Sequence, residues 1–111
     1  MYEMGRQFVL CNVAGFSHWD GPEVFDKLKV GAPLELVGEP DNPYDPNAVA
    51  VLLDGTKIGY VPRKCNSVIA QLMFYGHGDV FYALVASIDP EEDLEHRVTM
   101  SIRVTDVRQF G

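Results

Sequence analysis

The sequence predicts a mainly β fold, in which six short strands form a closed or nearly closed OB-like barrel and two short helices lie between them. Two observations carry this prediction: six segments have strand composition or alternation, and turn-forming residues separate them. A barrel is expected because closure removes the exposed strand edges that a small sheet otherwise leaves. A flat α+β sheet is the main competing architecture.

The strand segments are rich in apolar and β-branched residues and are followed by turn-forming residues such as glycine, proline or aspartate. In chain order they are residues 8–13, 34–37, 48–53, 57–61, 80–88 and 95–105. The third and fourth are joined by Asp54-Gly55, a dipeptide typical of hairpin turns. In the last segment apolar and polar residues alternate, so Met100 and Ile102 are predicted to face the core and Ser101 and Arg103 the solvent.

Two helices are expected in the remaining chain. The first begins at Pro22, whose fixed φ suits an initial helical turn, and ends before Gly31. The second covers residues 65–75, where apolar residues, among them Val68 and Ile69, recur with helical spacing. The Phe74-Tyr75 pair at its end is expected to pack in the core.

Length and composition indicate one domain, residues 1–111, of ordinary globular type. No apolar stretch is long enough to span a membrane, and the N-terminus resembles no secretory signal. Cys11 and Cys65 fit no metal or redox motif, so we expect reduced, buried thiols and a cytoplasmic protein.

The net charge of −7 argues against sequence-blind coating of nucleic acid, which depends on neutralising many phosphates. The charge is unevenly distributed, however. Residues 55–78 contain no acid but include Lys57, Arg63 and Lys64, which predict a local positive patch. The acidic residues of 91–95 are expected to face away from it.

The most informative segment is residues 39–48, where three prolines stiffen the chain. Asn42 and Asp45 each precede a proline, and their side chains are suited to Asx-turns. The segment therefore predicts a rigid loop that presents Tyr44 beside Asp45. A well-made turn without a ligand explains the same residues about equally well.

Several motifs in one order resemble a HIRAN domain. They are Val13-Ala14-Gly15, Glu39-Pro40, Asn42-Pro43-Tyr44-Asp45, Asn47-Ala48-Val49-Ala50-Val51 and Ile58-Gly59-Tyr60-Val61-Pro62-Arg63, and they cover about residues 8–88. The resemblance implies an OB-like barrel. By analogy with the eukaryotic members it also implies recognition of the 3′-hydroxyl end of single-stranded DNA, in a DNA repair or replication-stress context.

The chemistry of the residues fits such a ligand. Asp45 is able to accept a hydrogen bond from a free 3′-hydroxyl and would repel a phosphate in its place. Tyr44 offers a ring on which a base stacks. Arg63 and Lys64 are candidates for the preceding phosphate, and Tyr60 offers a further ring or hydroxyl.

The family pattern adds three candidate site residues, which are Asn42, His18 and Trp19. Asn42 matches the family motif. Where the eukaryotic DNA-binding members carry an arginine and then an aromatic residue, this chain has Ser17 and His18. His18 and Trp19 are the remaining candidates for stacking.

Other chemistry is less favoured by the sequence. His18, His77 and His96 are not spaced as metal ligands, and neither a catalytic motif nor a cofactor motif is present, so we expect no metal, no cofactor and no enzyme. The main alternative to DNA binding is a protein- or peptide-interaction module on the same barrel. A small hydrolase that uses the loop carboxylates is a weaker third hypothesis.

Overall fold

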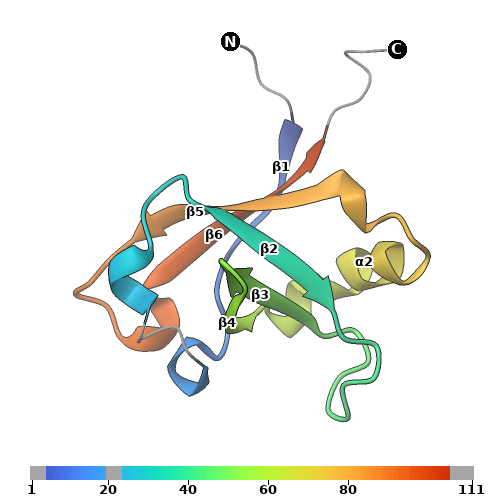
Figure 1. The fold of residues 1–111 in the computed structure, drawn as a ribbon, viewed down its shortest axis with the longest axis horizontal. Helices are drawn as coiled ribbons and strands as arrows, with labels where there is room; N and C mark the ends of the chain where they lie inside the picture. Colours follow the sequence, from blue (N-terminus) through green and yellow to red (C-terminus); the bar gives the residue numbers. More distant parts are fainter. Residues whose placement is uncertain (1–4, 20–23, 106–111) are drawn as a thin grey trace.

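The computed structural model describes residues 5–19 and 24–105 of the 111-residue chain. Six strands form one antiparallel sheet in the order β1-β6-β5-β2-β3-β4 (Figure 1). Their bounds are β1 Gly5–Asn12, β2 Pro33–Gly38, β3 Val49–Leu53, β4 Thr56–Tyr60, β5 Phe81–Ile88 and β6 Val98–Thr105. The mainly β prediction is confirmed, and each predicted strand segment overlaps one of these strands.

Strand β2 connects the two halves of the sheet. Its first two residues, Pro33 and Leu34, pair with β5, whereas Glu35–Gly38 pair with β3. This change of partner within one strand lets β3 and β4 lie below the long β5–β6 pair instead of extending it (Figure 1). The sheet therefore curls toward a barrel, and the two edge strands, β1 and β4, approach each other.

The edges meet at a single pair of residues in the described chain. Ala14, just beyond β1, donates its N–H to the Tyr60 carbonyl at 2.8 Å, and Tyr60 donates back to the Ala14 carbonyl at 2.8 Å. A Cβ on Gly59 would lie 2.4 Å from the Ala14 oxygen. An isolated bridge, which we call the Ala14–Tyr60 seam, thus links the two edges, and no ladder pairs β1 with β4.

The second predicted helix is present as α2, Arg63–Phe74. It begins two residues earlier than predicted, so Arg63 belongs to its first turn. Ile69 and Ala70 are buried, but Val68 is half exposed, which corrects the predicted apolar face. The first predicted helix falls partly on residues 20–23, outside the described residues, and the described part that follows is the 3₁₀ turn η2, Phe25–Lys27.

Two predictions for the last strand segment need correction. Residues before Val98 are not strand, because a 3₁₀ turn, η4 (Leu94–His96), precedes β6. Met100 and Ile102 face the core as predicted, but Ser101 is buried as well. Its hydroxyl donates to Gln7 Oε1 at 3.1 Å, since β1 pairs with β6 and shields it. Short 3₁₀ turns also occur at η1 (Phe16–His18) and η3 (Gly78–Val80).

The core lies between the two halves of the curled sheet and α2. Its largest fully buried side chains come from nearly every element: Val13, Phe16, Val49, Val51, Ile58, Ile69, Val85, Val98, Met100 and Ile102. None of the described helices has the length and apolarity needed to cross a bilayer.

Replacing Gly59 with alanine is expected to destabilise the fold by roughly 1–3 kcal/mol, because the added Cβ would overlap the Ala14 carbonyl. Chemical denaturation measures the change. Gly38→Ala is the matched control, since a Cβ there meets Met73 at an ordinary 3.6 Å. Equal stability of the two variants would show that the seam does not constrain the fold.

Candidate nucleic-acid interface

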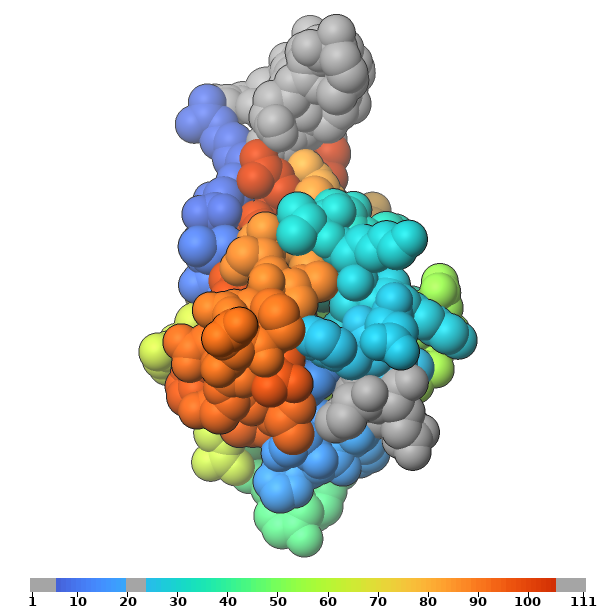
Figure 2. All heavy atoms as spheres, turned by 90° about the vertical axis from the view of Figure 1, so that its left-hand side faces the viewer, coloured from blue at the N-terminus to red at the C-terminus, as the bar shows by residue number. Residues whose placement is uncertain are grey.

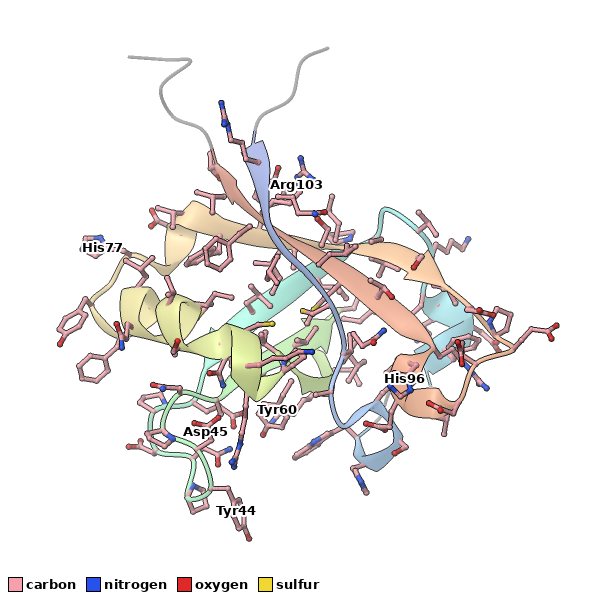
Figure 3. The ribbon with its side chains drawn as sticks, turned by 180° about the vertical axis from the view of Figure 1, so that it is seen from behind. Tyr44, Asp45, Tyr60, His77, His96 and Arg103 are labelled. Carbon is pink, nitrogen blue, oxygen red and sulfur yellow. The ribbon has the colours of Figure 1, made fainter. Side chains whose placement is uncertain are left out.

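A cavity of about 440 Å³ opens at the Ala14–Tyr60 seam, between the 39–48 loop and η1. Figure 2 shows the loop as the lower projection of the molecule, below η1, and Figure 3 shows Tyr44, Asp45 and Tyr60 at this end. We call this cavity the seam pocket. It is lined by Ala14, Gly15, Trp19, Asn42, Pro43, Tyr44, Asp45, Ala48, Tyr60, Val61, Arg63 and Asn66.

Six of the eight predicted site residues therefore line one pocket: Trp19, Asn42, Tyr44, Asp45, Tyr60 and Arg63. The other two, His18 and Lys64, are exposed and lie outside its lining. His18 follows the buried Phe16 in η1, and Lys64 follows Arg63 in the first turn of α2. In both cases the adjacent residue, Trp19 or Arg63, which the sequence also predicts, lines the pocket instead.

The 39–48 loop is held by the predicted Asx-turns. Asn42 Oδ1 accepts the backbone N–H groups of Tyr44 at 2.8 Å and Asp45 at 3.2 Å. Asp45 Oδ1 accepts the N–H of Asn47 at 2.9 Å. These bonds fix the loop from its own side chains, while the Tyr44 side chain remains 84% exposed. The loop thus presents a free aromatic ring on a rigid backbone.

The Asp45 carboxylate is held from both sides. Besides the Asn47 amide, Asn66 Nδ2 donates to its Oδ2 at 2.9 Å, and Arg63 Nε lies 3.6 Å from the same oxygen. The Asn47 backbone bond, the Asn66 side chain and the Arg63 charge together lower the pKa of Asp45. Asp45 is therefore an ionised acceptor at neutral pH.

A second cluster of polar side chains surrounds the Tyr60 hydroxyl. Lys57 Nζ donates to Glu39 Oε2 at 2.7 Å and to the Tyr60 hydroxyl at 3.1 Å, and that hydroxyl donates to Glu39 Oε1 at 2.8 Å. Burial would raise the pKa of Glu39, but the bonds from Lys57, Asn42 and Tyr60 outweigh it and lower this pKa. Lys57 also lies 4.2 Å from the centroid of the Trp19 ring, a cation–π contact.

The η1 turn carries Trp19 to the pocket and is fixed at two points. Phe16 is fully buried, and Glu95 accepts the N–H groups of Gly15 and Ser17 at 2.9 Å and the Ser17 hydroxyl at 2.6 Å. The Ser17 hydroxyl is the main cause of the lowered pKa of Glu95. Among the acids of 91–95, Glu95 therefore bonds the turn that borders the pocket.

The predicted positive patch is also largely neutralised. Lys57 is paired with Glu39, and Arg63, the cation that lines the seam pocket, is paired with Asp45, so each of the two has an acid beside it. Arg63 is the more available of the two, because its side chain is 73% exposed and its Nη2 reaches only the Tyr44 carbonyl at 2.9 Å. The first turn of α2 contains no acid, so its positive helix end adds to Arg63.

None of the histidines and cysteines of the described residues lines the seam pocket. Among the described residues no three His, Cys, Asp or Glu side chains are grouped as metal ligands. Figure 3 places His77 and His96 at opposite ends of the molecule. Cys11 and Cys65 are free thiols, the first buried and the second half-buried, and burial together with the nearby Cys65 raises the pKa of Cys11 to about 12.

Comparison with known proteins agrees with this arrangement. The model of the HIRAN domain family matches residues 7–105. The chain belongs to the HIRAN family. HIRAN domains are nucleic-acid-binding modules without catalytic activity of their own.

Two solved structures resemble this HIRAN domain. A protein from Lactobacillus plantarum is 25% identical, with a TM-score of 0.74 over 92% of this chain and 97% of that one. The HIRAN domain of human HLTF is 18% identical, with a TM-score of 0.65 over 92% of this chain and 81% of that one. Among curated proteins no significant match exists.

Three residues of this HIRAN domain escaped the sequence analysis. Glu39 and Glu95 pair with residues 18 and 78 positions away, and no local pattern indicates such pairs. Asn66 was detectable, because it is a polar residue within the apolar face of the predicted helix. Its burial needed a partner, and Asp45 supplies it.

The stability of this HIRAN domain is expected to fall in acid. The lowered pKa values of Asp45 and Glu39 mean that both carboxylates stabilise the fold while ionised. This contribution is complete above the unfolded-state values, about 3.9 and 4.3, and is lost as the pH falls through the lower folded-state values.

Melting temperatures measured from about pH 6 down to pH 2 test this. Glu39→Gln is expected to flatten the acid part of the profile. The control is Glu35→Gln, which removes the same charge from an exposed position. Parallel profiles for the two variants would contradict a stabilising role of the Glu39 carboxylate.

Proposed function

We propose that this HIRAN domain binds the 3′-hydroxyl end of single-stranded DNA in the seam pocket, without catalysis. The observation that supports it best is the pairing of an ionised carboxylate with an exposed ring on one rigid loop: Asp45 beside Tyr44. A terminal nucleotide carries the two complementary groups, a hydroxyl donor and a stackable base.

Asp45 selects for an end because of its charge. Asn47 and Asn66 occupy one acceptor site on each oxygen, and a carboxylate has about four such sites. Room remains for a hydroxyl donor. A strand interior has a phosphate where the end has a hydroxyl, and the ionised carboxylate repels it.

Tyr44 and Trp19 provide the apolar contact. Both line the seam pocket, and both are exposed. Lys57 covers part of the Trp19 ring, and Tyr60 packs edge-to-face on it at 5.8 Å, which fixes that ring. Tyr44 is held only through its backbone and is therefore the ring that can adjust to a base.

Arg63 supplies the phosphate contact in this proposal. Its ion pair with Asp45 is long and mostly exposed, and such pairs contribute little stability. Moving the guanidinium to a phosphate therefore costs little. The predicted role of single-strand ends in DNA repair or replication stress, and a cytoplasmic location, belong to this same proposal.

Asp45→Asn tests the selection of ends. The change keeps the size and one acceptor oxygen but removes the charge. We expect weaker binding of a 3′-hydroxyl strand, because charged acceptors bond more strongly, and better binding of a 3′-phosphate strand. Fluorescence anisotropy with both strands at low salt gives the ratio.

Tyr44→Ala is the matched variant on the same loop. It should weaken both strands by about 1–3 kcal/mol, the range for one lost base stack, and leave the ratio unchanged. Melting curves check that both variants fold. An Asp45→Asn variant that shifts both ligands equally, or a wild type that binds neither end, would refute end recognition.

Arg63→Ala is expected to weaken all strands by a similar factor and to lower the salt dependence by about one phosphate contact. Anisotropy titrations over a series of salt concentrations measure the slope. Lys64→Ala is the control, because Lys64 neighbours Arg63 but does not line the pocket. A slope that is unchanged in Arg63→Ala would exclude its phosphate contact.

A protein- or peptide-interaction module is the second candidate function, and one surface favours it. Phe74 and Tyr75, predicted to pack in the core, are instead 68% and 72% exposed. They border a groove of about 650 Å³ on the other side of the 39–48 loop, where Glu39 is the charged residue of the lining. A groove without cations suits a peptide better than a phosphate backbone. Failure of both DNA ends to bind would favour this candidate.

A further inference from the structure

Asn66 is an unusual residue for its position in the fold. It projects from the core-facing side of α2 and is 2% exposed, and with Ser101 it makes up the buried polar side chains of the described residues. Burying an amide is costly unless its polar groups are paired. Its Nδ2 donates to Asp45 Oδ2 at 2.9 Å, so the amide reaches out of the core to the 39–48 loop.

This bond determines which acceptor sites of Asp45 remain. Oδ1 is engaged by the Asn47 N–H at 2.9 Å, and Oδ2 by Asn66, with Arg63 Nε at 3.6 Å beside it. A guanidinium bound to a carboxylate in the bidentate manner needs both oxygens free on one side. A hydroxyl needs a single site. The engaged carboxylate is thus better suited to one hydroxyl donor.

We infer that Asn66 is a positioning residue, which fixes the Asp45 carboxylate so that the seam pocket accepts a single hydroxyl donor. The inference rests on the proposed function and names the residue that gives Asp45 its selectivity. Asn66 acts through Asp45 and lies outside the motifs that resemble the HIRAN family.

A purely structural role would give a different result. If Asn66 only ties the loop to α2, its loss lowers stability and weakens all ligands by a similar factor. If it positions Asp45, its loss removes the preference for a hydroxyl while the stack on Tyr44 persists. The ratio of two ligand affinities separates these roles.

The test uses Asn66→Leu, which keeps the volume and removes the donor. Two strands of the same sequence are compared by anisotropy, one ending in a 3′-hydroxyl and one in a 3′-hydrogen. Wild type is expected to prefer the hydroxyl by about tenfold, as for one hydrogen bond to a charged group, and Asn66→Leu to lose most of this preference. Gln71→Leu, an exposed amide on the same helix, should retain it.

A second measurement does not depend on DNA. NMR titration of the Asp45 carboxyl should show its pKa rising in Asn66→Leu and unchanged in Gln71→Leu. Arg63 is the charged group that faces Asp45, and it is present in both variants. Asn66→Ala replaces Asn66→Leu if melting curves show that the leucine variant does not fold.

The outcomes distinguish the two proposals. If wild type binds neither strand, the proposed function is wrong, and the NMR titration alone decides whether Asn66 positions Asp45. If DNA binds but Asn66→Leu keeps the preference for a hydroxyl, the inference is overturned and the proposed function stands. An Asp45 pKa that does not change in Asn66→Leu also overturns it.

Discussion

The close approach of Ala14 to Gly59 and Tyr60 is the constraint on which the rest of the structure depends. Two backbone hydrogen bonds of 2.8 Å join the edges of the sheet there, and only a residue without a Cβ fits at position 59. The same contact places the chain after β1, with Gly15 and Trp19, next to the end of β4 and the start of α2. The seam pocket is therefore a consequence of this contact between the edges of the sheet.

The pocket is preorganised by polar contacts that this chain supplies to itself. The Asn42 side chain accepts the backbone N–H of Tyr44 in the loop, and Asn66 donates to the Asp45 carboxylate. Glu39 accepts hydrogen bonds from Lys57 and Tyr60, both of which contact the Trp19 ring. Each acid has a cation or amide partner, so the site is close to neutral although the chain carries a net charge of −7. Such a site favours a ligand recognised by a hydroxyl and a ring over one held by many phosphates.

Much of this arrangement could be predicted from local sequence, and the failures have a common cause. The Asx-turns at Asn42 and Asp45 were predicted correctly, since they involve neighbours two or three residues apart. The positive patch was not, because Lys57 meets Glu39 across 18 residues. The hydrophobicity of Phe74 and Tyr75 predicts burial in the core, but both residues lie at the C-terminal end of α2, where they remain exposed.

By itself, the sequence determined the strands, the second helix, the stiff loop and the family, because each depends on short-range periodicity, proline and glycine chemistry or contiguous motifs. The tertiary structure decided which faces are buried, as at Ser101 and Val68, and which of two neighbours reaches the pocket: Trp19 and not His18, Arg63 and not Lys64. It also brought Asn66 into contact with Asp45 and Glu95 into contact with Ser17. Those outcomes depend on the register between distant strands and on the point where the sheet edges meet, and one-dimensional patterns do not encode either.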